Sequence, residues 1–297
     1  MTASRPSVFD RRRLRHSFGR AAPGYAEVAV LQREVESRLL EQLDALGEKK
    51  PLRILDVGSG PGRASGVMKG RWPKAQVIAL DIALPMLRQV PRNTRFWRPV
   101  RQVCGEASQL PFSDGSIDVI FSNLCLQWVP DLPVALAEFR RVLREDGLLL
   151  FSTFGPDTLV ELREAYLQAG ERTPPLSPFA AIQQVGDAMI AAGFRNPVLE
   201  RDLFNLEYPQ VMGLLRELRA IGAGDARVQR PRGLGGKSRQ KKMIEAYEAL
   251  REGERLPSTW EVISASARAP GAGTPRREGA LDIASFPADR ISVRKRR

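Results

Sequence analysis

The chain is 297 residues long, with 43% hydrophobic residues, two cysteines and a formal net charge of +12 at pH 7. This length suits one large domain or two small ones, and no apolar run reaches the ~18 residues of a transmembrane helix. Two cysteines are too few for a disulfide framework, and no Cys/His cluster indicates a metal site. We therefore expect a cytoplasmic protein with neither a metal nor a membrane partner, whose N-terminus lacks the apolar stretch of a secretory signal.

The positive charge is concentrated at the two ends of the chain. Residues 1–20 carry six arginines against one aspartate, and residues 226–297 carry 17 lysines and arginines against eight acidic residues. Residues 21–225 are close to neutral. Basic flanks around a neutral middle indicate a polyanionic partner, either nucleic acid or an acidic protein, although such charge also serves solubility alone.

The N-terminal part combines a basic segment with a helix. Residues 5–20 are predicted to be irregular or a short helix, and His16, the only histidine, is expected to be a surface or structural residue there. Apolar residues recur at three- and four-residue spacing over 26–46. This spacing predicts an amphipathic helix that ends at Gly47.

A strand and a glycine-rich turn come next, and the rest of the site is arranged around them. Residues 52–57 form an apolar run typical of a buried parallel strand, and Gly58, Gly60 and Gly62 follow it. Glycines allow positive φ and let a ligand approach the backbone closely. The dinucleotide-binding pattern would need a further glycine at the position of Arg63, so this turn differs from it.

Asp56, at the end of that strand, bears on the class of ligand. A carboxylate beside the turn repels a phosphate. Sites that bind pyrophosphate place it at a helix N-terminus and have no carboxylate beside it. The turn therefore favours a ligand with cationic or hydroxyl groups and no phosphate. S-adenosylmethionine, with an amino group, a sulfonium and a ribose, has this composition. Taken alone, the stretch also permits a glycine-rich turn with no ligand.

Two more acidic residues follow predicted strands. Residues 75–81 form a second strand ending in Asp81, whose carboxylate can accept hydrogen bonds from both ribose hydroxyls. Glu106 follows a third strand at 103–105, where its carboxylate can accept from an adenine amino group while the Ala107 N–H donates to the ring.

The fourth strand is predicted at 116–123 and the fifth at 148–153, separated by a helix over 131–144 and a turn at 144–147. Strands that alternate with helices predict an α/β fold with a doubly wound, mostly parallel sheet and ligands at its carboxyl edge.

Two further strands, near 197–208 and 258–266, complete the predicted sheet. Helical patterns at 211–221 and 243–250, joined by the basic, glycine-rich stretch 227–242, lie between them and predict a lid. The predicted parts are a basic segment and capping helix at 1–46, a core at 47–208 plus 256–268 with 155–183 contributing to the lid, a helical lid insertion at 209–255, and a flexible basic tail at 269–297.

Over residues 45–155 the order of these motifs, with Leu110-Pro111-Phe112 and Asp118-Val119-Ile120 downstream, resembles the class I S-adenosylmethionine-dependent methyltransferases. Glu106 departs from the aspartate that this family often has. The resemblance implies a Rossmann-like fold with a seven-stranded sheet and S-adenosylmethionine as cofactor. The implied cofactor-binding residues are Asp56, Gly58, Ser59, Gly60, Gly62, Asp81, Ile82, Glu106, Ala107, Asn123 and Tyr25.

Two acceptor classes lose support at the end of the fourth strand, which reads Ser122-Asn123-Leu124-Cys125. Methyltransferases acting on planar amino nitrogens usually carry a proline pair there, and cytosine-carbon methyltransferases carry a Pro-Cys nucleophile. Cys125 follows a leucine, so we interpret it as a small core residue.

Motifs outside the sheet strands make the resemblance more specific. These motifs are Phe18 to Ala22 with Tyr25, Leu31-Gln32-Arg33, Ser122-Asn123-Leu124 with Leu126-Gln127-Trp128, Phe151 to Arg163, Val185 to Met189, and Glu217 to Ala223. With them the chain resembles, over residues 8–265, the malonyl-acyl-carrier-protein O-methyltransferases of biotin synthesis, although it reads Ala265-Ser266-Ala267-Arg268 where that family often has His-Ala-Trp.

This resemblance implies methylation of the free carboxylate of a malonyl thioester, on acyl carrier protein or coenzyme A, which masks the carboxylate for elongation toward pimeloyl thioester. No general base is needed, because a carboxylate with a pKa near 4 is already ionised at neutral pH. We expect no catalytic residue, a bidentate contact from Arg163 to the carboxylate, and Tyr25 closing over the cofactor. The basic stretch 227–242 is expected to meet an acidic carrier protein.

Two other functions remain open at this point. The basic flanks favour an RNA methyltransferase, against which the missing proline and cysteine motifs speak, and another small-molecule acceptor is also compatible. A protein that holds the cofactor without catalysis, such as an assembly factor, would carry the same cofactor motifs.

Overall fold

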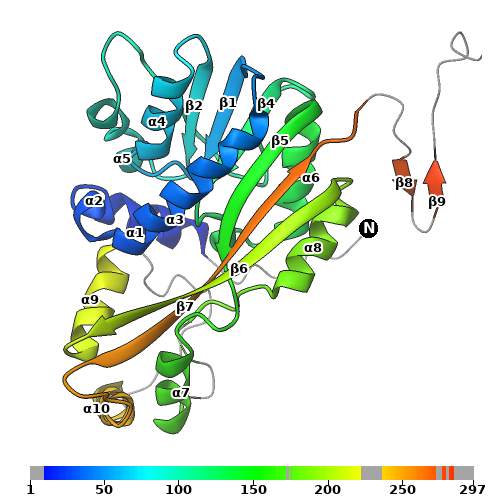
Figure 1. The fold of residues 1–297 in the computed structure, drawn as a ribbon. Helices are drawn as coiled ribbons and strands as arrows, with labels where there is room; N and C mark the ends of the chain where they lie inside the picture. Colours follow the sequence, from blue (N-terminus) through cyan, green and yellow to red (C-terminus); the bar gives the residue numbers. More distant parts are fainter. Residues whose placement is uncertain are drawn as a thin grey trace, which may run out of the picture.

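The computed structural model describes residues 10–171, 174, 176–221 and 236–271, with the backbone alone at 236–237, 276–278 and 281–283. A seven-stranded sheet in the order β3-β2-β1-β4-β5-β7-β6 forms its centre (Figure 1). The five strands from β3 to β5 are parallel, β7 is antiparallel to β5, and β6 is antiparallel to β7. The strands are β1 Arg53–Val57, β2 Gln76–Asp81, β3 Arg101–Cys104, β4 Ile117–Ser122, β5 Leu143–Phe154, β6 Arg195–Tyr208 and β7 Leu256–Arg268.

Helices cover both faces of this sheet, as the predicted doubly wound fold requires (Figure 1). The α-helices are α1 Arg11–Ala21, α2 Tyr25–Val28, α3 Val30–Glu41, α4 Arg63–Arg71, α5 Leu84–Leu87, α6 Leu132–Val142, α7 Val160–Gln168, α8 Ile182–Ala191, α9 Val211–Ala220 and α10 Gly236–Glu248. Three 3-10 turns are η1 Gln42–Leu46, η2 Val90–Asn93 and η3 Leu126–Trp128.

The parallel strands are buried on both sides, which explains why they read as continuous apolar runs. On one face Leu55 and Phe151 pack with Phe139 of α6 and residues of α8. On the other face Phe121 packs with Leu39 of α3 and residues of α4. Neighbouring residues of one strand point to opposite faces, so each strand contributes to two separate cores.

Beyond the carboxyl edge, β6 and β7 continue as a long hairpin that leaves the rest of the sheet (Figure 1). Helices α9 and α10 connect these two strands, at the place where the helical patterns predicted an insertion. A third core joins the hairpin to α7, α9 and α10 through Leu162, Leu214, Met243, Tyr247 and Trp260. The insertion therefore has its own apolar core and forms a wall above the sheet edge.

Three elements differ from their predictions. The helix predicted over 26–46 is divided at Ala29, whose ψ of +56° interrupts it, while the Ala26 carbonyl accepts a hydrogen bond from the Arg33 guanidinium. Apolar spacing locates a helix face but not a bend along it. The expected end at Gly47 is confirmed by its φ of +55°.

The turn predicted at 144–147 is part of β5, because Leu143 and Leu148 pair with Ile117 and Val119 across an irregularity in register. In the tail expected to be flexible, Arg276–Glu278 (β8) and Leu281–Ile283 (β9) form an antiparallel pair. Residues 1–9 lie outside the described part of the chain. Within the described part, no helix is both long and apolar enough to cross a membrane.

Candidate active site

A cavity of about 310 Å³ lies at the carboxyl edge of the sheet. The ends of β1 and β2, the loop after β3 and helix α1 line one half of it, with Gly58, Gly60 and Asp81 in its wall. Strands β5 and β7 with helices α7 and α9 line the other half, which is largely apolar and includes Phe154 and Trp260. We call these the cofactor half and the acceptor half.

The glycine turn forms the floor of the cofactor half. The N–H groups of Gly58 and Ser59 donate to the Leu80 carbonyl at 2.8 and 3.0 Å, which holds the turn against β2. Gly58 has a φ of +70°, and a Cβ atom there would lie 2.4 Å from the Cys125 sulfur. Gly60 has a φ of +52°, and no atom lies within 4 Å of where its Cβ would be. Packing against Cys125 therefore requires glycine at position 58. At position 60 the absence of a side chain leaves the floor of the cavity open.

Asp81 holds this turn from the end of β2. Its Oδ2 accepts from the Gly60 N–H at 2.9 Å, and its Oδ1 accepts from the Ala83 N–H at 2.7 Å. Burial raises the pKa of Asp81 to about 6, against the lowering effect of these backbone hydrogen bonds. Asp81 lines the cavity, and the remaining lone pairs of its carboxylate can accept hydrogen bonds from further donors such as ribose hydroxyls.

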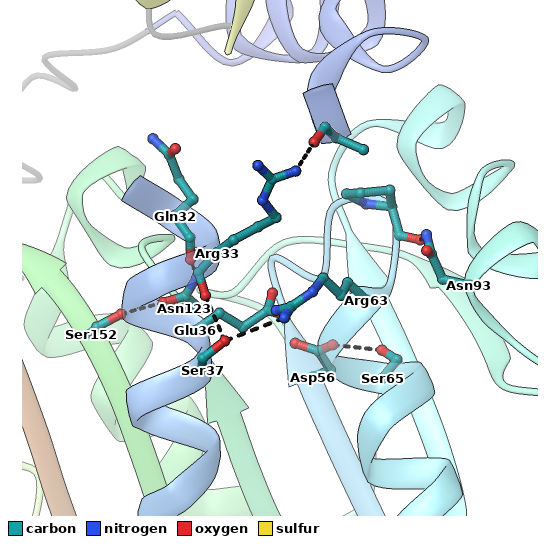
Figure 2. A network of polar contacts seen from close by, with 12 residues as sticks. Gln32, Arg33, Glu36, Ser37, Asp56, Arg63, Ser65, Asn93, Asn123 and Ser152 are labelled. Carbon is teal, nitrogen blue, oxygen red and sulfur yellow. Dashed lines mark hydrogen bonds and ion pairs between the residues drawn. The ribbon is translucent and has the colours of Figure 1, made fainter. Parts of the chain in front are cut away.

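Asp56 lies behind the turn and does not line the cavity. Its Oδ2 accepts from the Ser65 hydroxyl at 2.5 Å, which links β1 to α4 (Figure 2). Arg63, at the start of α4, reaches Glu36 and Ser37 of α3 beside it (Figure 2). The two contacts fasten the helix that follows the glycine turn. Burial raises the pKa of Asp56 to about 7, although the Ser65 hydrogen bond lowers it.

This buried carboxyl predicts a pH dependence of stability. Its native pKa of about 7 exceeds the ordinary aspartate value of 3.8, so between these two pH values the native state binds more protons than the unfolded state. The free energy of unfolding should therefore fall as pH rises from 5 to 8. Asp56→Asn should remove much of this loss, on the order of 2–4 kcal/mol, in denaturant unfolding of the cofactor-free protein at both pH values. An unchanged pH dependence in the variant would contradict the prediction.

Helix α1 covers the cofactor half, and sequence reasoning did not place it there. Glu106 pairs with Arg11 at 2.8 Å and with Arg15 at 3.2 Å, and Arg11, Leu14 and Phe18 line the cavity. The carboxylate expected to accept from an adenine amino group thus also fastens α1. The signal was the spacing of Leu14 and Phe18, four residues apart between exposed arginines, which indicates an apolar stripe facing inward.

Asn123 joins the two halves at the end of β4. Its amide nitrogen donates to the Gln32 carbonyl at 2.9 Å, and its Oδ1 accepts from the Ser152 hydroxyl at 2.8 Å (Figure 2). Tyr25 lies on the same wall, and burial, followed by the negative charge of Asp81, raises the pKa of its phenol. Burial also raises the pKa of the Cys125 thiol to about 12. A protonated thiol is a poor nucleophile, which agrees with the interpretation of Cys125 as a core residue.

Arg163, the residue predicted to contact the acceptor carboxylate, lies on α7 outside the cavity wall. Its guanidinium donates to the carbonyls of Pro156 and Thr158 at 2.8 and 3.2 Å. The same turn is held by Glu261, which is 2% exposed and accepts from the Asp157 N–H at 2.7 Å. Arg163 therefore stabilises the turn after β5. The sequence places this arginine on a helix but does not predict which groups its side chain contacts.

Comparisons with known proteins agree with this geometry. A family model described as a methyltransferase domain matches residues 55–151. The chain is 53% identical over 290 residues to the malonyl-[acyl-carrier protein] O-methyltransferase of Xylella fastidiosa (strain M23), covering 97% of this chain and 98% of that protein. A protein of the same name from Gallionella capsiferriformans (strain ES-2) is 41% identical over 285 residues, covering 94% and 98%. The chain belongs to this O-methyltransferase family.

Solved structures share the fold of this family member. The YcgJ protein from Bacillus subtilis matches with a TM-score of 0.54 at 19% identity, over 79% of this chain and 99% of that one. Phosphoethanolamine N-methyltransferase 2 from Haemonchus contortus, in complex with phosphomonomethylethanolamine and S-adenosylhomocysteine, matches with a TM-score of 0.52 at 20% identity, over 79% and 52%. With the strand order, these matches confirm the predicted class I methyltransferase fold.

The cavity walls of this O-methyltransferase family member fit S-adenosylmethionine. Gly60 leaves an open floor, Asp81 presents a hydroxyl acceptor, and Ile82 and Ala107 offer apolar surface to a base. The predicted cofactor residues that line the cavity are Gly58, Gly60, Asp81, Ile82, Glu106, Ala107, Asn123 and Tyr25. Those that do not are Asp56, Ser59 and Gly62.

Proposed function

We propose that this protein transfers the methyl group of S-adenosylmethionine to the free carboxylate of a malonyl thioester carried by acyl carrier protein, in the cytoplasm, giving the methyl ester that begins the acyl chain of biotin. The observation that carries this proposal is the full-length similarity to the family, joined to a cavity with one half suited to the cofactor and one apolar half.

The proposed reaction requires little acid–base catalysis from the protein. When bound, S-adenosylmethionine supplies an electrophilic methyl group, and the acceptor carboxylate is already ionised at neutral pH. The chain has to orient that carboxylate and exclude water. The apolar walls from Phe154, Leu162 and Leu215 serve this purpose. The raised pKa of Tyr25 keeps its phenol protonated near neutral pH, so it acts as a hydrogen-bond donor and not as a base.

Arg219, near the end of α9, is the cation that we assign to acceptor capture in place of Arg163. It is exposed, lines the cavity, and makes no ion pair with the described residues. An exposed arginine at this wall attracts an anionic acyl group by long-range charge. Arg216 lies on the same helix, is also exposed, and stays outside the cavity wall.

Arg219→Ala should therefore raise KM for the malonyl carrier protein about five- to tenfold with kcat within twofold, because steering acts on encounter. Arg216→Ala is the matched control and should leave KM within twofold. Arg163→Ala should instead lower the melting temperature by disordering the turn after β5. Steady-state kinetics and thermal unfolding of the three variants separate these roles; equal KM values for the two α9 variants would refute the assignment.

The acidic carrier protein is proposed to dock on the basic surfaces of α1, which lines the cavity, and of α10. Arg11, Arg12 and Arg13 are exposed on α1, and Lys241 and Lys242 are exposed on α10. The predicted docking stretch 227–242 falls within the described residues only from 236 onward. Turnover of the carrier protein should fall steeply with added salt, while a short malonyl thioester should be little affected. Equal salt sensitivity of the two acceptors would argue against docking by charge.

Incubation with labelled S-adenosylmethionine tests the function as a whole. The malonyl carrier protein should acquire the label, and RNA and acetyl carrier protein should not, because neither offers the malonyl carboxylate. Labelling of RNA alone would favour the RNA methyltransferase alternative. Saturable binding of S-adenosylhomocysteine without labelling of any acceptor would favour a non-catalytic assembly factor.

A further inference from the structure

Two buried polar side chains on the cavity wall have atoms without a hydrogen-bond partner. These atoms are the indole nitrogen of Trp260, a residue 3% exposed, and the amide oxygen of Gln32, a residue 9% exposed. Buried polar atoms in native proteins are nearly always paired, because an unpaired one retains its full desolvation penalty. An acceptor group of a ligand would pair with the Trp260 N–H, and it would pair with the Gln32 amide once rotation of that amide exchanges its oxygen and its NH₂.

The indole of Trp260 is fixed by its neighbours. Its ring centroid lies 5.2 Å from that of Phe154, which in turn lies 5.7 Å from that of Phe179, and the backbone at Trp260 pairs with Phe204 of β6. The next residue, Glu261, is committed to Arg201 at 2.5 Å and to the turn after β5. The packing holds the aromatic ring in place, and its N–H has no partner although the residue lines the acceptor half.

Gln32 lies on α3 at the boundary between the two halves. Its backbone carbonyl is used by Asn123, but its side chain extends away from the network of Asn123 and Ser152 (Figure 2). Rotation of the terminal amide exchanges its oxygen and its NH₂, so the same side chain can present a donor to the cavity.

We propose that the Trp260 N–H and the Gln32 amide hold the carboxylate of the acyl acceptor, an assignment that rests on the proposed function. Two neutral donors orient a carboxylate without placing a buried cation against it, so the oxygen keeps its nucleophilicity and no further charge is desolvated. Hydrogen bonds to an ionised carboxylate are about twice as strong as those to neutral groups. Methylation removes that charge, so the same two donors bind the ester product less tightly and favour its release.

Trp260→Phe keeps the ring packing and removes only the N–H. The variant should lose about ten- to a hundredfold in kcat/KM for the malonyl thioester, while the Kd for S-adenosylhomocysteine stays within twofold. Gln32→Met, which keeps the side-chain length and removes the amide, should lose a similar factor. Trp97→Phe is the matched control, because Trp97 is 59% exposed and lies outside the cavity.

The NMR signal of the indole N–H tests this contact directly, because it would not respond to the acceptor if Trp260 had only a structural role. In the ¹⁵N–¹H spectrum of ¹⁵N-labelled protein saturated with S-adenosylhomocysteine, the Trp260 Nε1–H signal should shift downfield with a malonyl thioester and stay in place with an acetyl thioester. The chain has four tryptophans, so variants at Trp72, Trp97 and Trp128 assign this signal by elimination if Trp260→Phe does not fold.

The two hypotheses fail in different ways. Wild-type kcat/KM in Trp260→Phe, or an indole signal that responds equally to both thioesters, would overturn the assignment of Trp260 while the proposed function stands. Failure of the wild-type protein to methylate the malonyl thioester would overturn the proposed function itself.

Discussion

Asp81→Ala should weaken S-adenosylhomocysteine binding about a hundredfold, measured by calorimetry on the pure protein. Asp81 is 8% exposed and accepts from the N–H groups of Gly60 and Ala83. Its removal takes away the acceptor for the ribose hydroxyls and also releases the glycine turn that forms the floor. A charged hydrogen bond and a displaced turn together account for roughly 2.7 kcal/mol, which corresponds to that factor.

Asp118→Ala is the matched control for this loss. Asp118 also accepts from two backbone N–H groups, those of Leu52 and Arg53 at 2.8 and 2.7 Å, but at the opposite, amino edge of the sheet. Both variants should lose about 1–3 kcal/mol of stability, because each leaves two backbone donors without their acceptor, and Asp118→Ala also breaks an ion pair with Arg144 at 2.7 Å. Only Asp81→Ala should lose cofactor affinity, and a similar loss of affinity in both would show that Asp81 acts through stability alone.

Gly60→Ala should raise the Kd for S-adenosylhomocysteine about ten- to a hundredfold. Its Cβ would enter the open floor, where the cofactor is expected to lie against bare backbone. Overpacking of a fitted site costs roughly 1–3 kcal/mol, which gives this range. Calorimetric titration of the folded variant measures the effect.

The backbone cost of this substitution can be measured separately. Gly47 has a φ of +55°, close to the +52° of Gly60, and nothing lies within 4 Å of its Cβ position either. It ends η1 and does not line the cavity. Gly47→Ala and Gly60→Ala should both lose stability, because each places an alanine at positive φ, and only Gly60→Ala should also lose cofactor affinity. Unchanged cofactor affinity in Gly60→Ala would show that the floor of the cavity lies elsewhere.

Several features of the site follow from local sequence alone. Glycines at Gly58 and Gly60 after a buried strand predict a turn open to a ligand, and Asp81 closes the next strand beside it. Their proximity could be predicted because parallel strands end at one edge of a sheet, so residues that end neighbouring strands lie close together there. The order of strands and helices, and hence the fold, is readable for the same reason.

Other predictions depended on where side chains point, and there the sequence was insufficient. Asp56 was expected beside the ligand, but its carboxyl turns back to Ser65 behind the turn. Arg163 was expected at the substrate, but its guanidinium orders the turn before α7. Residue type and spacing place a Cα atom near an edge, whereas the direction of a side chain depends on which partner packing brings within reach.

The amino-acid sequence by itself determined the doubly wound sheet, the glycine floor and the acid that ends β2, because all three depend on contacts between neighbouring segments of a regular pattern. Only the tertiary structure decided that α1 covers the cofactor half and that Trp260 and Gln32 share the cavity wall. Trp260 and Gln32 are 228 positions apart in the chain. Their place on the wall of one cavity depends on where the β6–β7 hairpin leaves the sheet and on where α3 lies, and packing of the whole chain sets both.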